Sequence, residues 1–167
     1  MKLDWSVSDA LDGASSLPAR SECMAWAEAA LRFAGRPPRA WELSVMIVDR
    51  AEMADLNQRF RGKSGPTNVL SFPYEPLPGV ELPMLGDIVI CAPVVAEEAR
   101  ERGGPEPDHW AHMLIHGVLH LCGHDHLEAS QAAVMESLET RILASLGFPD
   151  PYDAGFRPTR KYDTRHE

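Results

Sequence analysis

Residues 86–91 read Gly86-Asp87-Ile88-Val89-Ile90-Cys91 and are dominated by β-branched side chains. Such side chains favour an extended backbone packed in a sheet, so the run predicts a buried strand. A second apolar run, Leu43–Val48, predicts another strand, and Asp49 directly after it can cap a short helix. Pro93 is suited to the first turn of a helix that follows residues 86–91. Strands therefore alternate with helices, which is typical of a sheet covered by helices.

The rest of the chain adds two strands and the remaining helices. Lys2–Val7 alternates in polarity like a strand, and Asn68–Phe72 predicts another. Pro73 must end that strand or place it at an edge, because proline cannot donate to the ladder. Further helices are expected from a cap at Ser21, within Asp108–Cys122, and over Leu127–Leu146 with Ala133, Val134, Leu138, Ile142 and Leu146 inward. We expect an α/β (α+β) fold with a small mixed four-stranded sheet and about five helices.

Length and composition fit a single globular domain. Of 167 residues, 44% are hydrophobic and 25% charged, which is enough to bury one core. The apolar stretches stop short of the roughly 20 residues that a membrane-spanning helix needs, and the first residues do not resemble a secretory signal. We expect a cytoplasmic protein with one domain over residues 1–152 and a basic tail over 153–167. The cysteines are expected to be free thiols: Cys23, Cys91 and Cys122.

The charge distribution limits which partners the protein can have. A formal net charge of -9 repels a polyanion at long range and counts against a nonspecific nucleic-acid coat. Arg59, Arg61 and Lys63 nevertheless form a short cationic run without an acid between them. Such a run is usually a solvated face, but it can also be a confined binding site.

Histidines are concentrated in one segment, His116–His126. On a helix, His116 and His120 lie one turn apart on the same face, about 6 Å along the axis, as two ligands of one metal require. Gly123 can end that helix in the left-handed conformation, after which the chain can turn back and bring His126 to a third ligand position. A three-histidine site with an open fourth position is typical of catalytic zinc.

Several alternatives remain at this segment. The His-x3-His-x2-Gly-x2-His spacing is also that of metzincin proteases, but those carry a glutamate general base where this chain has Gly117. His124 competes with His126 as third ligand, although we favour His126. His112 lies one turn before His116. It is either a polar residue of the first helical turn, or a group that donates a hydrogen bond to a metal-binding residue or contacts a phosphate.

Two aspartates, Asp87 and Asp125, are further candidates for orienting carboxylates. Both lie at a strand end or in a turn, where aspartate is also common for purely structural reasons.

These motifs together resemble the YbeY family of bacterial endoribonucleases, also described as ribosomal-RNA maturation factors. Besides His116–His126, the segments that resemble the family are Leu56–Lys63, Pro66–Pro73, Leu85–Cys91, His109–His112 and Gly147–Tyr152. The family usually has tyrosine at the position of His124 and often at that of Phe60.

The resemblance implies that His116, His120 and His126 hold one zinc or similar divalent ion and that Arg61 is the catalytic arginine. Lys63 is a weaker candidate for RNA binding. The implied task is cleavage of single-stranded RNA in 3′-end maturation of small-subunit ribosomal RNA and in ribosome quality control. Implied partners are the ribosomal RNA precursor and ribosomal proteins or assembly factors, without membrane or DNA. The alternatives are an assembly factor with a structural metal and another zinc-dependent hydrolase.

Overall fold

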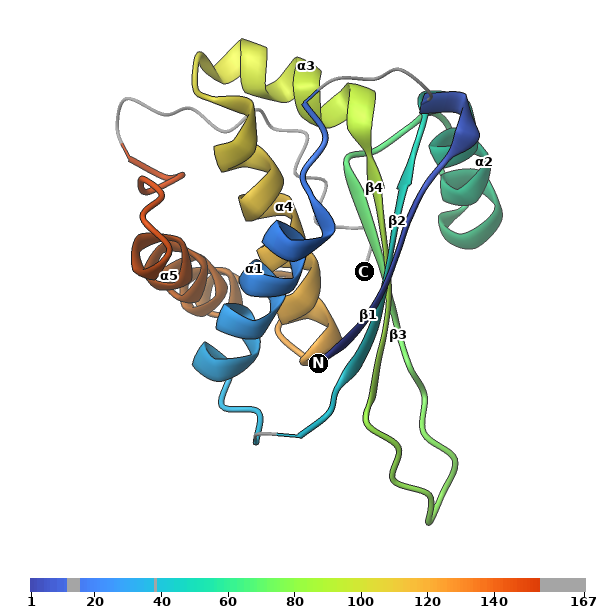
Figure 1. The fold of residues 1–167 in the computed structure, drawn as a ribbon, viewed down its shortest axis with the longest axis vertical. Coiled ribbons are helices and arrows are strands. Elements are labelled where there is room, and N and C mark those ends of the chain that lie inside the picture. Colours follow the sequence, from blue (N-terminus) through green and yellow to red (C-terminus); the bar gives the residue numbers. More distant parts are fainter. Residues whose placement is uncertain (12–15, 38, 154–167) are drawn as a thin grey trace.

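The computed structural model describes residues 1–11, 16–37 and 39–153, which form one α/β domain (Figure 1). The strands are β1 (Lys2–Val7), β2 (Glu42–Val48), β3 (Val69–Pro73) and β4 (Met84–Cys91). The α-helices are α1 (Arg20–Phe33), α2 (Arg50–Arg61), α3 (Ala92–Arg102), α4 (Glu106–Leu121) and α5 (Ala129–Ser145). Within these residues the four strands and five helices confirm the predicted fold class. The predicted basic tail, apart from Asp153, lies outside the described residues.

The sheet is mixed and has the strand order β1-β2-β4-β3. β1, β2 and β4 run parallel, whereas β3 pairs antiparallel with β4. Figure 1 views the sheet nearly edge-on, with α1, α4 and α5 on one side and α2 on the other. β3 is an edge strand that ends at Pro73, as predicted. At its start, the backbone N–H of Val69 donates to Asn68 Oδ1 at 2.7 Å.

Helix α4 occupies the centre of the fold, because every residue from His109 to Leu121 is buried. It packs closely against the sheet at Gly117. A Cβ atom at that position would lie 3.1 Å from Ile88 Cδ1 and 3.2 Å from Ser71 Oγ, so a larger side chain would push the helix away from the sheet. Despite this burial, no helix in the described part of the chain is both long and apolar enough to cross a membrane.

Two local predictions are wrong. Helix α1 takes Ala19 rather than Ser21 as its N-cap, because Glu22 reaches back and accepts the Ala19 N–H at 2.9 Å. Helix α5 buries Ile142 and packs Leu138 and Leu146 against the core as predicted, but Ala133 and Val134, also predicted to face inward, are exposed. The buried residues of α5 are Met135, Glu139, Ile142 and Leu143. A pattern of apolar residues alone could not identify this face, since a carboxylate lies at its centre.

The segment after Pro73 is the connection of a long hairpin between β3 and β4. The Tyr74 N–H donates to the Leu85 carbonyl at 3.0 Å and extends the pairing beyond β3. Opposite Pro73, Gly86 has a φ of +138°, and a Cβ there would collide with the Phe72 carbonyl oxygen and lie 3.0 Å from Pro73 Cα. Only glycine fits this position without moving the backbone.

Gly86→Ala should therefore lower the free energy of unfolding by about 2–4 kcal/mol, because strain at φ adds to a collision with backbone atoms. Gly79→Ala is the matched control. Gly79 has a φ of +80° in the same hairpin, but nothing lies within 4 Å of a Cβ there, so we expect a loss of only about 1 kcal/mol. Urea unfolding of both variants measures the difference, and equal losses would contradict the steric argument.

Candidate metal centre

Three histidines come together at the C-terminal end of α4. His120 Nε2 lies 3.1 Å from His116 Nε2 and 3.0 Å from His126 Nε2. His116 and His120 come from α4, and His126 comes from the segment that follows it. Their side chains are nearly buried, and one nitrogen of each lies within 4.8 Å of the corresponding nitrogen of the other two. The structure thus brings together the three residues that the sequence singled out as ligands.

The turn at Gly123 makes this convergence possible. Gly123 has a φ of +95°, and its N–H donates to the His120 carbonyl at 2.9 Å. The His124 N–H then donates to the Leu119 carbonyl at 3.0 Å, which closes the end of the helix. Asp125 Oδ1 accepts the backbone N–H of His126 at 2.7 Å and lies 3.8 Å from His126 Nδ1. His126, and not His124, therefore joins the histidine group.

This group fits a divalent transition metal. In a tetrahedral zinc site with Zn–N bonds of about 2.0–2.1 Å, two ligand nitrogens lie about 3.3–3.4 Å apart. The observed spacings of 3.0 and 3.1 Å are close to that value. Three neutral imidazoles whose Nε2 atoms face one another cannot all satisfy these atoms by mutual hydrogen bonds, whereas a shared cation satisfies all three lone pairs. His116, His120 and His126 could therefore hold a metal ion.

The position after His116 explains why the chain departs from the protease pattern. Gly117 faces Ile88 and Ser71 of the sheet, not the histidine group. A glutamate there would have to enter the packed core between α4 and the sheet. The protease-type general base is thus excluded by packing as well as by sequence.

A buried carboxylate on α5, Glu139, is hydrogen-bonded to His116 of the histidine group and to the neighbouring His112. Glu139 Oε2 accepts hydrogen bonds from His112 Nε2 at 2.6 Å and from His116 Nδ1 at 3.3 Å. The Tyr152 hydroxyl donates to Glu139 Oε1 at 3.0 Å. The side chain of Glu139 is only 1% exposed. Because His116 donates Nδ1–H to this carboxylate, its Nε2 is the nitrogen left to face a metal.

The pKa shifts agree with this assignment. Burial lowers the pKa of His112, while the neighbouring Glu139, to which its Nε2–H donates, acts in the opposite direction. Burial alone would raise the pKa of Glu139, but His112 and His116 outweigh burial and hold that pKa below its usual range. Glu139 is an ionised acceptor. Neither Glu139 nor Tyr152 was assigned a role from sequence, since nothing near them in the chain marks them as partners of His112.

Arg61 lies at the outer edge of β3. Its Nη2 donates to the Ser71 carbonyl at 2.9 Å, and its guanidinium carbon lies 4.9 Å from the centre of the Phe72 ring. The Ser71 hydroxyl donates in turn to the Gly117 carbonyl at 3.3 Å, next to His116. A chain of two hydrogen bonds therefore connects Arg61 to the helix that carries the histidines.

The turn that follows Arg61 is fixed by a buried side chain. Asn57 Nδ2 donates to the Gly65 carbonyl at 2.8 Å, and Gly62 ends α2 in the left-handed conformation. Lys63 lies in this turn and is half-buried. The turn is thus a defined structure that places Lys63 near Arg61 in the chain and in the fold.

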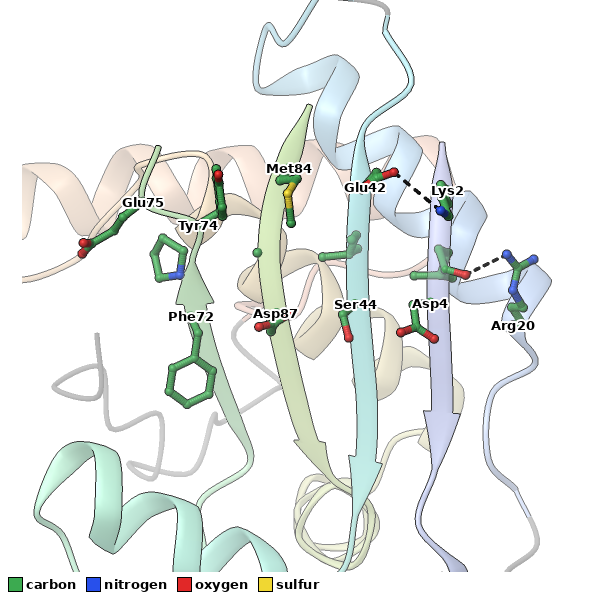
Figure 2. Close-up of a pocket in the computed structure, with 14 residues that line it drawn as sticks. Lys2, Asp4, Arg20, Glu42, Ser44, Phe72, Tyr74, Glu75, Met84 and Asp87 are labelled. Atoms are coloured by element: carbon green, nitrogen blue, oxygen red, sulfur yellow. Dashed lines mark hydrogen bonds and ion pairs between the residues drawn. The ribbon is translucent and has the colours of Figure 1, made fainter. Parts of the chain in front are cut away.

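Asp87 lies on the opposite face of the sheet from the histidines. Figure 2 shows Asp4, Ser44 and Asp87 in a row across β1, β2 and β4, with α5 behind the sheet. They line an open cavity of about 840 Å³ together with Phe72. Burial, and then the charge of Asp4, raise the pKa of Asp87. Asp87 therefore does not contact the histidine group, unlike Asp125, which adjoins His126.

The choice between His126 and His124 can be tested by metal content. His126→Ala should lose bound metal, because it removes one of the three converging nitrogens. His124→Tyr should keep the metal, since His124 lies outside the group. Elemental analysis of both purified variants measures this, and metal retained by the first but lost by the second would overturn the assignment.

The hydrogen bond from His116 to Glu139 predicts that Glu139 affects how tightly the histidine group binds a metal ion. Glu139→Gln removes the charge while keeping the shape, so His116 should lose its fixed orientation and metal affinity should fall roughly 10- to 100-fold. Glu136→Gln, an exposed position on the same helix, serves as control and should bind as tightly as the parent. Competition with a chromophoric chelator gives both affinities. Equal affinities for the two variants would show that Glu139 does not support the site.

Comparison with known proteins shows the family and the fold of the chain. The profile of the family described as Endoribonuclease YbeY matches residues 13–147. A relative from Alkalilimnicola ehrlichii, named Endoribonuclease YbeY, is 53% identical over 152 residues, which cover 90% of this chain and 91% of the relative. The solution structure of a Thermotoga maritima protein shares the fold, with a TM-score of 0.53 at 23% identity over 90% of this chain and 99% of that one. The chain belongs to the YbeY endoribonuclease family.

Proposed function

We infer that this protein is a metal-dependent endoribonuclease that cleaves single-stranded RNA. The observation that carries the proposal is the connection of a three-histidine group to an oriented arginine: Arg61 is bonded to Ser71, and Ser71 to Gly117 beside His116. A site that can hold a cation, connected through β3 to a fixed guanidinium, suits a phosphodiester, whose charge increases in the transition state. Membership of the family supports the same activity.

Each residue has a separate task in this proposal. A divalent ion bound by the three histidines would supply Lewis-acid catalysis at the phosphate. Glu139 keeps His116 in the tautomer that binds the ion. Arg61, held in orientation by the Ser71 carbonyl and the Phe72 ring, binds a phosphate oxygen and stabilises the added charge. Lys63 binds the RNA backbone as a point charge.

We further propose that the physiological substrate is the precursor of small-subunit ribosomal RNA, cleaved in 3′-end maturation and ribosome quality control in the cytoplasm, with zinc as the metal. The strongest support is the extent of the family resemblance, which includes the histidine segment His116–His126 and the two segments Leu56–Lys63 and Pro66–Pro73 around Arg61. The net charge of -9 also supports a substrate bound at a confined cationic site or delivered by protein partners, because long-range attraction of RNA would be weak.

The assignment of tasks predicts a different loss for each of three variants. His116→Ala should lose both metal and RNA cleavage. Arg61→Ala should keep the metal, while its cleavage rate falls about 10²- to 10³-fold, the usual effect of removing one donor to a developing negative charge. Lys63→Ala should mainly weaken binding and reduce its salt dependence. Cleavage of labelled single-stranded ribosomal RNA fragments, with metal analysis of each preparation, measures these effects.

Arg141→Ala is the control for loss of an arginine that stacks on an aromatic ring. Arg141 lies over Phe33 at 5.5 Å, on helix α5, and its removal should leave cleavage unchanged. If Arg61→Ala cleaved as fast as the parent, or if metal-free His116→Ala remained active, the nuclease assignment would fail. A ribosome-assembly factor with a structural metal would then be the better description.

A further inference from the structure

An exposed aromatic ring stands beside Arg61 at the end of α2. Phe60 is 53% exposed, although it is one of the larger apolar side chains in the protein. Its ring meets the half-buried Phe72 edge-on, with centroids 5.4 Å apart and an angle of 71° between the planes. Two guanidiniums flank the pair: that of Arg59 lies 5.5 Å from the Phe60 centroid, and that of Arg61 lies 4.9 Å from the Phe72 centroid. We call these four residues the Phe60 platform.

The platform is carried by regular structure. Phe60 and Arg61 belong to the last turn of α2, which Gly62 ends in the left-handed conformation, and Phe72 belongs to β3. A ring fixed in this way loses little conformational freedom when a flat ligand stacks on it. Nothing in the packing of the core requires Phe60, whose side chain is mostly in solvent.

The platform also has a fixed relation to the metal centre. Arg61 follows Phe60 directly and is bonded to Ser71, whose hydroxyl reaches Gly117 of the metal-binding helix. When a phosphate is bound at Arg61, the nucleoside attached to it is therefore near Phe60. In the proposed function, the phosphate at Arg61 is the one to be cleaved.

Charge separates the platform from the neighbouring cavity. The cavity of Figure 2, which Phe72 also lines, has more acids than bases in its lining: Asp4, Glu42, Glu75 and Asp87 against Lys2 and Arg20. Phosphates are repelled there. The platform instead has Arg61 and Arg59, the latter paired with Asp55 at 3.4 Å, and Lys63 lies in the turn that follows. An RNA strand is thus favoured over the platform and disfavoured across the open sheet.

We propose that Phe60 is a stacking platform for one unpaired RNA base next to the phosphate held by Arg61. A base is free to stack on a side chain only when it has left its own helix, so the platform selects single-stranded over duplex RNA. The stacking face is sequence-tolerant, because every base has a π-face. This inference rests on the proposed function and adds to it the residue that recognises the base.

Binding to a 2′-O-methyl oligoribonucleotide of mixed sequence, confirmed to stay intact, tests the proposal by fluorescence anisotropy. Phe60→Ala should weaken binding roughly 10- to 100-fold. Phe60→Tyr should bind within about twofold of the parent, since it keeps the ring. Phe60→Leu keeps apolar bulk without a π-face and should remain at least about fivefold weaker. Val134→Ala, at an apolar side chain on α5 that is 55% exposed, is the control and should bind normally.

Abasic substitutions provide a second measurement that does not depend on Arg61. In the parent, one abasic position in the oligonucleotide should weaken binding markedly, and in Phe60→Ala that position should lose its effect. The metal content of the variants should match the parent, and their thermal melting should fall only slightly, because Phe60 is about half exposed and its main loss is the contact with Phe72.

The proposal is overturned if Phe60→Ala or Phe60→Leu binds like the parent, or if no abasic position matters. Should the parent bind and cleave single-stranded RNA while Phe60→Ala does both equally well, the platform alone fails. Should the parent bind the oligonucleotide but cleave no RNA with metal present, the proposed function fails, and the Phe60 variants still decide the platform. Should the parent bind no single-stranded RNA, both fail.

Discussion

The close contact between Gly117 and the sheet holds the structure and the candidate site together. Because Gly117 has no side chain, α4 lies near enough to β3 for the Ser71 hydroxyl to reach its backbone carbonyl. The same Ser71 offers its own carbonyl to Arg61 on the other side. Histidines from one layer and an arginine from another are thus fixed by one residue of an edge strand. A methyl group at position 117 would lie 3.2 Å from Ser71 Oγ and would therefore disturb this relation at the hydroxyl that makes it.

Glu139 shows what a buried charge contributes here. Moving a carboxylate out of water costs several kcal/mol, and three hydrogen bonds to a charged acceptor, each contributing about 1.5–3 kcal/mol, offset that cost. If one donor is lost, the remaining charge destabilises the protein. The carboxylate therefore ties three elements to a single arrangement: α4 through His112 and His116, α5 through Glu139 itself, and the segment after α5 through Tyr152. Such an arrangement orders the ligands before a metal arrives.

Local sequence patterns were sufficient to predict most of the strands and helices and the three histidines that come together. The β-branched run in β4, the capping residue Asp49 and the edge position implied by Pro73 all depend on neighbours in the chain, and the structure agrees with each. The histidine spacing likewise encodes one helical turn and one glycine stop. Glu139 could not be found in this way, because its partner His112 is 27 residues away and a glutamate within a helix usually faces solvent. For the same reason the first turns of α5 were misjudged: Ala133 and Val134 are exposed, whereas Met135 and Glu139 are buried. The location of Asp87 depended on which face of the sheet α4 covers: α4 packs at Gly117 against Ile88, so the neighbouring Asp87 points to the other face.

The outer edge of β3 has one further consequence. Residues 69, 71 and 73 direct their backbone polar groups away from β4, where a strand from another molecule could pair with them. The Val69 N–H is taken by Asn68, the Ser71 carbonyl is taken by Arg61, and Pro73 has no N–H. The Arg61 side chain therefore covers one of the carbonyls with which a strand of another molecule could pair. Loss of this side chain would leave the Ser71 carbonyl open to an incoming strand, so the exposed edge of the sheet would gain one more site for pairing between molecules.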